Sequence, residues 1–375
     1  TGGRNIQSVQ MADLDGDGQQ EALAFFRMSS DEKPLKIFVF KIEGDSYARY
    51  CTIESSGTAI DSVYYQDLNG DGRRELIVGW RISAEVQTVA VYTVAREPVA
   101  LMSSGYTRFT IQDLNGDGIP SLLVLRTDAD SQPVAEFYGW QDEQMGVAYR
   151  CVLSSTMASV NRGSLVSGRL DADTTALYIT GVDEQGMAAT DILVFRQDLG
   201  LVNLALSGSS TGVSNAVFPY RQLLPQDING DGIIELPSPD TSWTAEQTDG
   251  LVSWLCCDGD GQLSTVAKTY HSLSCGWYFT IPESWWDWSV ETATTSISNE
   301  NQFSLAINGD PVLSLYTIGV NVSYDGISLG TTSSKRAVRA AAANIEEVTR
   351  EVLGDESYAV DKALLQQETK VVLRS

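Results

Sequence analysis

The sequence predicts a mainly β fold: a β-propeller of about five four-stranded blades with metal-loop hairpins, followed by a small α+β domain. Three observations predict it. An acidic, glycine-containing loop recurs along the chain, and each copy precedes a short apolar run typical of a buried strand. The copies begin at residues 13, 67, 113, 171 and 227, which places them 46 to 58 residues apart. A period near 50 residues is typical of propeller blades.

The clearest copy reads Asp67-Leu68-Asn69-Gly70-Asp71-Gly72-Arg73-Arg74-Glu75. Oxygen-bearing side chains stand at positions 1, 3, 5 and 9, so alternate residues can surround a hard cation while the glycine at position 6 takes the turn. The residue at position 7 would offer its backbone carbonyl. An EF-hand needs a carboxylate at position 12 and a following helix, but Val78 stands there inside an apolar run. The pattern therefore predicts a calcium loop within a β-hairpin.

Three further copies share this pattern, and together they predict three or four structural Ca²⁺ ions. The third copy has Ser121 at position 9 and is expected to bind more weakly, whereas the unit at Asp171 lacks the glycine and the late carboxylate and is expected to be empty. The predicted ligand residues are Asp13, Asp15, Asp17, Gln19 and Glu21; Asp67, Asn69, Asp71, Arg73 and Glu75; Asp113, Asn115, Asp117 and Ile119; and Asp227, Asn229, Asp231, Ile233 and Glu235.

These loops resemble the FG-GAP/VCBS-type repeat of integrin α-subunit propellers and of many bacterial surface proteins. The resemblance covers roughly residues 5–272 and rests on four intact or nearly intact motifs. It implies that each loop joins two strands of a blade and holds calcium in a structural role. It implies no catalytic chemistry.

Alternating apolar and β-branched residues predict the strands of the individual blades. The blades are expected at approximately residues 5–56, 59–104, 107–155, 163–208 and 219–272, within a propeller domain over residues 1–275. Asp258-Gly259 predicts a hairpin turn rather than another metal loop.

Residues 276–375 are predicted to form the α+β domain. Trp277–Ile281 and Thr369–Leu373 are expected as strands. Lys335–Leu353 is expected as an amphipathic helix, because Val338, Ala341 and Ile345 fall on one helical face.

Composition restricts the expected cellular location and the expected classes of partner. The formal net charge is −24, which disfavours nucleic acid as a partner, and no apolar run approaches the ~18–20 residues that span a membrane. Calcium loops of this kind suit the millimolar calcium outside cells, so we expect an exported bacterial protein, extracellular or at the cell surface. The chain begins at Thr1, which indicates a processed product and is compatible with an upstream lipid anchor.

The five cysteines give little further guidance. Cys51 and Cys151 occupy equivalent places in the first and third blades, which favours small buried side chains over a bridge. Cys256, Cys257 and Cys275 could include one disulfide, and their spacing fits no zinc pattern.

Few residues point to catalysis. His271 is the only histidine, so a nucleophilic triad would have to use it, and a packed position is the favoured interpretation. Asp142, Glu143 and Asp240 are the acids considered for glycoside hydrolysis. An aromatic group could either fill a core or stack against sugar rings; its members are Trp277, Tyr278, Trp285, Trp286 and Trp288.

The sequence thus favours a calcium-stabilised, non-catalytic binding scaffold that presents propeller loops to a protein or glycan partner. The alternative is a glycan-active enzyme, a glycosidase or lyase, with acidic residues in the propeller funnel.

Overall fold

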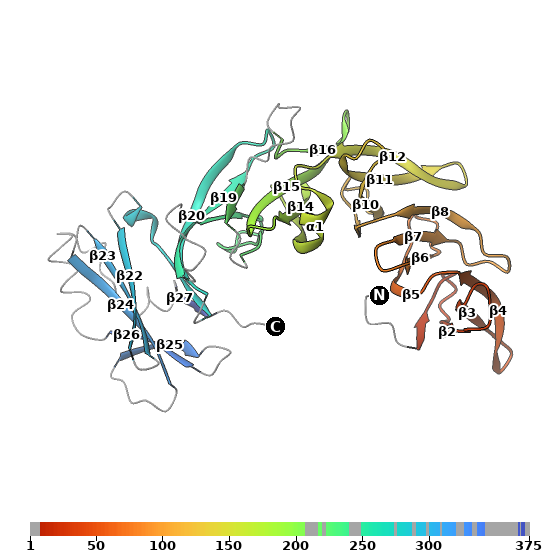
Figure 1. Cartoon of the computed structure of the whole chain (residues 1–375), viewed down its shortest axis with the longest axis horizontal. Helices are drawn as coiled ribbons and strands as arrows, with labels where there is room; N and C mark the ends of the chain where they lie inside the picture. The colour runs from red at the N-terminus through yellow and green to blue at the C-terminus, as the bar shows by residue number, and fades with distance from the viewer. Residues whose placement is uncertain are drawn as a thin grey trace. The chain divides into compact units, whose positions relative to one another are not determined.

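The chain divides into two compact units, Thr1–Ala216 and Val217–Ser375, which are described separately. The computed structural model describes residues 8–206, 217–219, 223–239, 249–273, 276–286, 290–297, 300–307, 310–319, 326–331, 336–341, 367 and 369–371. Figure 1 labels most of their helices and strands.

The described residues of the first unit form four sheets, each built from four consecutive antiparallel strands (Figure 1). Helix α1 (Met157–Arg162) precedes the fourth sheet. Thr156 caps it, since its hydroxyl accepts a hydrogen bond from the backbone N–H of Ser159 at 3.2 Å. The sheets comprise β1 (Val9–Ala12), β2 (Glu21–Arg27), β3 (Leu35–Glu43) and β4 (Ser46–Ser55); β5 (Ala59–Gln66), β6 (Glu75–Arg81), β7 (Gln87–Tyr92) and β8 (Ala100–Gly105); β9 (Arg108–Gln112), β10 (Ser121–Thr127), β11 (Pro133–Gln141) and β12 (Gln144–Val152); and β13 (Ser164–Arg169), β14 (Thr175–Val182), β15 (Met187–Arg196) and β16 (Gly200–Asn203).

The sheets of this unit pack face to face, which explains why their second strands are continuous apolar runs. In β6, Leu76 and Val78 belong to the core shared with the first sheet, whereas Ile77 belongs to the core shared with the third. In β10, Leu122 and Leu123 divide in the same way between the second and fourth sheets. Each of these side chains is fully buried. Alternate residues therefore fill the two cores on either side of one strand, as the stacking of propeller blades requires.

The second unit contains a fifth sheet of four consecutive strands, extended by β27, and a separate five-stranded sheet. The fifth sheet comprises β18 (Leu236–Pro239), β19 (Asp249–Cys257), β20 (Leu263–Ser272), β21 (Trp277–Thr280) and β27 (Thr369–Val371). The other comprises β22 (Val290–Ile297), β23 (Glu300–Ile307), β24 (Asp310–Gly319), β25 (Gly326–Thr331) and β26 (Arg336–Ala341). A short strand β17 (Val217–Pro219) and a 3₁₀ turn η1 (Glu283–Trp285) complete the described elements.

The predicted mainly β fold class, with five four-stranded units, is confirmed. Asp258 forms the expected turn between β19 and β20, since its carboxylate accepts hydrogen bonds from the N–H groups of Asp260 and Gln262. Sheet pairing continues beyond residue 275, because β21 pairs with β20. The predicted helix over Lys335–Leu353 is wrong for Arg336–Ala341, which form β26 between β24 and β25; its remainder lies outside the described residues.

Candidate metal loops and an adjoining cavity

Four acidic loops share one hydrogen-bonded frame. We number them by their sheet: loop 1 (residues 13–21), loop 2 (67–75), loop 3 (113–121) and loop 5 (227–235). Loops 1 to 3 connect β1 to β2, β5 to β6 and β9 to β10; loop 5 is closed by a bridge between Gln226 and Glu235. Loops 1 to 3 thus take the place within the hairpin that the sequence predicts.

The aspartate at position 1 organises each loop. In loop 2, the two carboxylate oxygens of Asp67 accept hydrogen bonds from the N–H groups of Gly70 at 2.6 Å and Gly72 at 2.8 Å. The equivalent bonds in the other loops measure 2.7–3.1 Å. Gly70 and Gly72 adopt φ values of 76° and 84°, which side chains other than glycine rarely accept. The glycine spacing therefore sets the loop backbone, and the frame leaves the side chains at positions 3 and 5 close together.

The glutamate at position 9 is buried in loops 1, 2 and 5. One oxygen of Glu21, Glu75 and Glu235 accepts a hydrogen bond from the N–H group at position 2, at 2.7, 2.9 and 2.9 Å. Burial raises the pKa of all three carboxyls above the ordinary value, and the neighbouring aspartates of each loop raise it further. For Glu235 the pKa rises to about 7. In these three loops the ionised form of the buried glutamate is therefore disfavoured, and a bound cation would stabilise it.

Loop 5 gives the sharpest test of whether these residues fit a metal. The second oxygen of Glu235, Oε1, is buried and has no hydrogen-bond partner among the described residues. Buried polar atoms without a partner are rare and costly. Asp227 and Asp231 lie close enough for their charges to raise the pKa of this carboxyl. An all-oxygen donor set with one unsatisfied carboxylate oxygen fits a hard divalent cation.

In loop 1 a lysine side chain already supplies positive charge next to the carboxylates. The ammonium group of Lys41, on β3, bonds to Asp15 Oδ2, lies 3.9 Å from Glu21 Oε1 and sits 4.4 Å from the ring centroid of Tyr50. Asp13, Asp15 and Glu21 each bring one carboxylate oxygen within 4.8 Å of the others, so this cluster could bind a metal. A metal in loop 1 would have to share these acids with Lys41.

Loop 3 and the unit at Asp171 contain fewer carboxylates than loops 1, 2 and 5, as the sequence predicts. Loop 3 has Ser121 at position 9, and the buried Oδ1 atom of its Asn115 has no partner in the described part of the chain. In the Asp171 unit, the carboxylate accepts hydrogen bonds from the N–H groups of Asp173 and Thr174 and forms an ordinary turn. The metal-ligand assignments themselves stay predictions.

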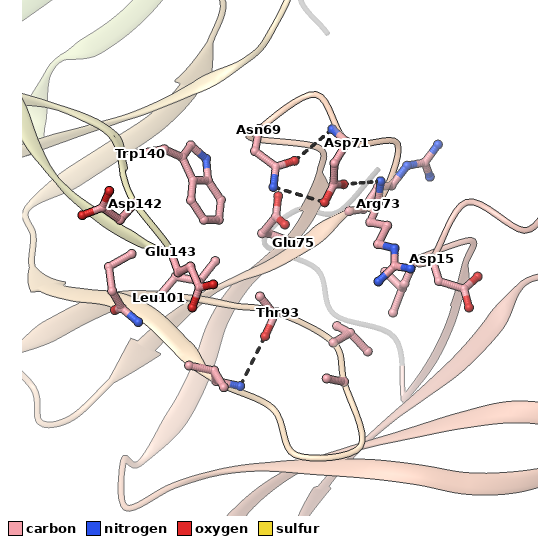
Figure 2. Close-up of a pocket in the computed structure, with 16 residues that line it drawn as sticks. Asp15, Asn69, Asp71, Arg73, Glu75, Thr93, Leu101, Trp140, Asp142 and Glu143 are labelled. Carbon is pink, nitrogen blue, oxygen red and sulfur yellow. Dashed lines mark hydrogen bonds between the residues drawn. The ribbon is translucent and has the colours of Figure 1, made fainter.

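A cavity of about 530 Å³ lies beside loop 2 in the first unit (Figure 2). Its walls come from three sheets: Leu14 and Asp15 of loop 1; Asn69, Asp71 and Glu75 of loop 2, with Arg73 and Arg74; the β7–β8 connection from Thr93 to Val99; and the β11–β12 turn from Trp140 to Gln144. Figure 2 shows Trp140, Asp142 and Glu143 on one side and Arg73 and Asp15 on the other.

Trp140 is fixed in this cavity by a hydrogen bond from its indole N–H to the backbone carbonyl of Leu68, at 2.7 Å. The ring is half-buried, whereas Asp142 and Glu143 are exposed at the turn. Asp142 has a φ of 58°, a left-handed conformation that Asp and Asn accept more readily than most residues. The sequence singled out the two acids but missed Trp140, because no local pattern shows that a turn of one sheet meets a loop of another.

The aromatic group of the second unit is mainly structural. Trp277 and Trp285 are buried, and the indole N–H of Trp277 donates to the Thr317 hydroxyl at 2.9 Å. Trp286 and Tyr278 are half-buried, and Trp288 lies outside the described residues.

His271 is also packed rather than poised for catalysis. It is 3% exposed and stacks on Tyr278 with ring centroids 4.9 Å apart. Burial lowers its pKa to about 3, so the imidazole is neutral at ordinary pH. Cys51, Cys151, Cys256 and Cys257 are free thiols, and Cys275 lies outside the described residues.

No family model matches the sequence. No curated protein matches it either. Among solved structures, the chain is similar to Bacillus licheniformis rhamnogalacturonan lyase PL11, with 16% identity, 90% of this chain and 64% of that chain covered, and a TM-score of 0.37. It is also similar to AofleA from Arthrobotrys oligospora, with 10% identity, 86% of both chains covered and a TM-score of 0.27. The chain thus spans less than two thirds of the lyase. With TM-scores below 0.5, these likenesses assign neither a ligand nor an activity.

Proposed function

We propose that this chain is a calcium-stabilised, non-catalytic binding scaffold with loops of the FG-GAP/VCBS type, working outside the cell and presenting its loops to a protein or glycan partner. The observation that supports it best concerns the buried Oε1 atom of Glu235, which has no hydrogen-bond partner in the described part of the chain. This atom lies inside a loop frame that recurs in three other repeats. A cation would satisfy this oxygen and offset the charge of the neighbouring aspartates.

Calcium is the preferred ion because the predicted ligands are carboxylate, amide and backbone oxygens from a single flexible loop. When bound, the ion supplies electrostatic cross-linking and no reaction chemistry. Position 1 already orders the loop backbone through its two glycine contacts, and the glutamate at position 9 ties the start of the loop to the next strand. Metal binding would therefore stabilise an arrangement that the chain itself builds.

The loops are expected to differ in affinity. Loops 2 and 5 have a full set of oxygen ligands, loop 3 lacks the carboxylate at position 9, and loop 1 must exchange Lys41 for the metal. This ranking places loop 1 lower than its four carboxylates alone would suggest. Since extracellular calcium is millimolar, even the weaker loops suit a cell-surface location.

The test is thermal unfolding of chelator-treated protein, titrated separately with calcium and with magnesium. A ligand that binds only the folded state stabilises it by mass action, so calcium should raise the unfolding midpoint and magnesium should raise it much less. Absence of any calcium effect would refute the metal role and leave the loops as hydrogen-bonded turns.

The alternative, a glycan-active enzyme, is supported by Asp142 and Glu143 at the edge of the cavity (Figure 2). A glycosidase needs one carboxyl kept protonated by a shielded environment. Both of these side chains are exposed, which favours binding over hydrolysis. Release of reducing sugar from plant and bacterial polysaccharides, lost in Glu143→Gln, would reverse this preference.

A further inference from the structure

We propose that the cavity beside loop 2 binds a neutral saccharide, with Trp140 as its stacking surface. This inference rests on the proposed function, since it names the ligand class for one site on the binding scaffold. Three features of the cavity support it: its size and aromatic wall, the balance of charge around it, and the kind of polar groups that line it.

The cavity has the dimensions and the wall that a sugar ring needs. Its volume of about 530 Å³ lies within the roughly 300–1,000 Å³ typical of small-molecule sites. Trp140 cannot turn freely, because its indole N–H donates a hydrogen bond to the Leu68 carbonyl, and the side chain is only partly buried, so part of its surface stays accessible. A fixed aromatic face offers apolar contact to the C–H face of a pyranose while its ring edge stays polar.

The charges around the cavity disfavour a strongly charged ligand. Asp15 is paired with Lys41, and Asp71 and Glu75 belong to the metal loop. What remains is two acids, Asp142 and Glu143, and two arginines, Arg73 and Arg74. A cationic ligand would meet the guanidinium groups and an anionic ligand would meet the carboxylates, so a neutral ligand is favoured.

The polar groups suit a ligand rich in hydroxyls. Carboxylates accept hydrogen bonds at two oxygens, guanidinium groups donate from a planar fork, and an amide such as that of Gln144 does both. The Thr93 hydroxyl adds a further donor and acceptor. A sugar carries adjacent hydroxyls that can donate to one of these groups and accept from another, which neither an alkyl chain nor a simple ion can do.

The experiment measures binding of neutral methyl glycosides to the full chain in calcium buffer. A panel of hexosides, 6-deoxyhexosides and N-acetylhexosaminides is screened by saturation-transfer NMR, and the best binder is titrated by calorimetry. At least one member is expected to bind. Trp140→Ala should weaken it by about tenfold or more. Asp142→Asn combined with Glu143→Gln should weaken it by about two- to twelvefold per lost hydrogen bond.

Matched control variants distinguish a loss of binding caused at the cavity from a general effect of the substitution on the protein. Trp286→Ala removes another half-buried tryptophan whose indole N–H also bonds to a backbone carbonyl, that of Ile281 at 3.0 Å. Asp198→Asn removes an exposed acid from the equivalent turn of the fourth sheet. Both should leave affinity within about twofold. Asp142→Asn keeps a residue that tolerates the left-handed backbone, so the acid variants test the site even where Trp140→Ala fails to fold.

Three results would overturn the inference: no glycoside in the panel binds, binding is the same in the Trp140 and acid variants as in the controls, or a tetralysine peptide or a uronic acid binds at the cavity in place of the neutral sugars. The proposed calcium-stabilised scaffold is tested by a different measurement, the shift of the unfolding midpoint with calcium. A calcium-stabilised protein that binds no glycoside therefore refutes the ligand class alone.

Discussion

Glu235→Gln distinguishes loop 5 without a metal from loop 5 with one, because the two states predict opposite effects of the same substitution. The amide has nearly the shape of the carboxyl and can still accept the hydrogen bond from the Ile228 N–H, which measures 2.9 Å in the native chain. The substitution removes the negative charge at a side chain that is 1% exposed.

In chelated protein, the size of the stability change caused by Glu235→Gln follows from the pKa of Glu235. Burial, together with Asp231 and Asp227, raises it from 4.5 to about 7. The folded state then holds a proton that the unfolded state releases, so stability falls as pH rises from about 4.5 and the penalty is complete above about pH 7. At roughly 1.4 kcal/mol per pH unit, the ionised side chain costs about 3 kcal/mol. The variant should therefore be more stable than the native chain at pH 8 and nearly equal at pH 4.

With calcium the stability difference between the variant and the native chain changes sign, because the Glu235 carboxylate becomes a metal ligand and the amide is a weaker ligand. The assay is calorimetric unfolding at pH 4 and pH 8, with chelator and with calcium. For a unit of this size, about 3 kcal/mol corresponds to a midpoint shift of roughly 6–12 °C. Glu85→Gln, an exposed acid, is the control and should show neither effect. A variant that is less stable than the native chain in chelator at pH 8, or that gains as much from calcium, would refute the reasoning.

Three further predictions concern single side chains. Ser121→Glu supplies the missing carboxylate of loop 3, whose buried Asn115 amide oxygen has no partner among the described residues, and should add a calorimetrically detectable calcium site. Lys41→Gln removes the ammonium group bound to Asp15; it should lower the unfolding midpoint of chelated protein and strengthen calcium binding to loop 1 by about tenfold, as measured by competition with a chelating dye. His271 should show no NMR titration between pH 4.5 and pH 8, since burial lowers its pKa to about 3.

The repeat was predictable because its determinants are local. Aspartate at position 1 and glycine at positions 4 and 6 define the loop by hydrogen bonds within six residues, as Asp67 and Gly72 show. The following strand is recognisable because its residues are buried on both faces, so Leu76, Ile77 and Val78 form an uninterrupted apolar run. Neither feature depends on contacts between distant parts of the chain.

The remaining features depend on pairing between distant segments. Lys41 reaches loop 1 because the β2–β3 register places Phe40 opposite Ala22, which brings the next residue beside Glu21. Arg336–Ala341 is short and rich in alanine, and its apolar positions show no strict strand alternation. Pairing with β24 and β25 decides in favour of a strand. Local propensity could not reveal either outcome.

Loop 2 links the two proposals physically. Asn69, Asp71 and Glu75 contribute to the predicted metal site and to the wall of the cavity, and the carbonyl that fixes Trp140 belongs to Leu68 in the same loop. An ion that holds loop 2 closed would therefore also fix the orientation of the tryptophan, although it would make no contact with a sugar. Coupling between two ligands is reciprocal, so a saccharide that requires the ordered loop must strengthen calcium binding by the same factor. Under this proposal the metal contributes to recognition by positioning a side chain, and the chemistry of recognition stays with the protein.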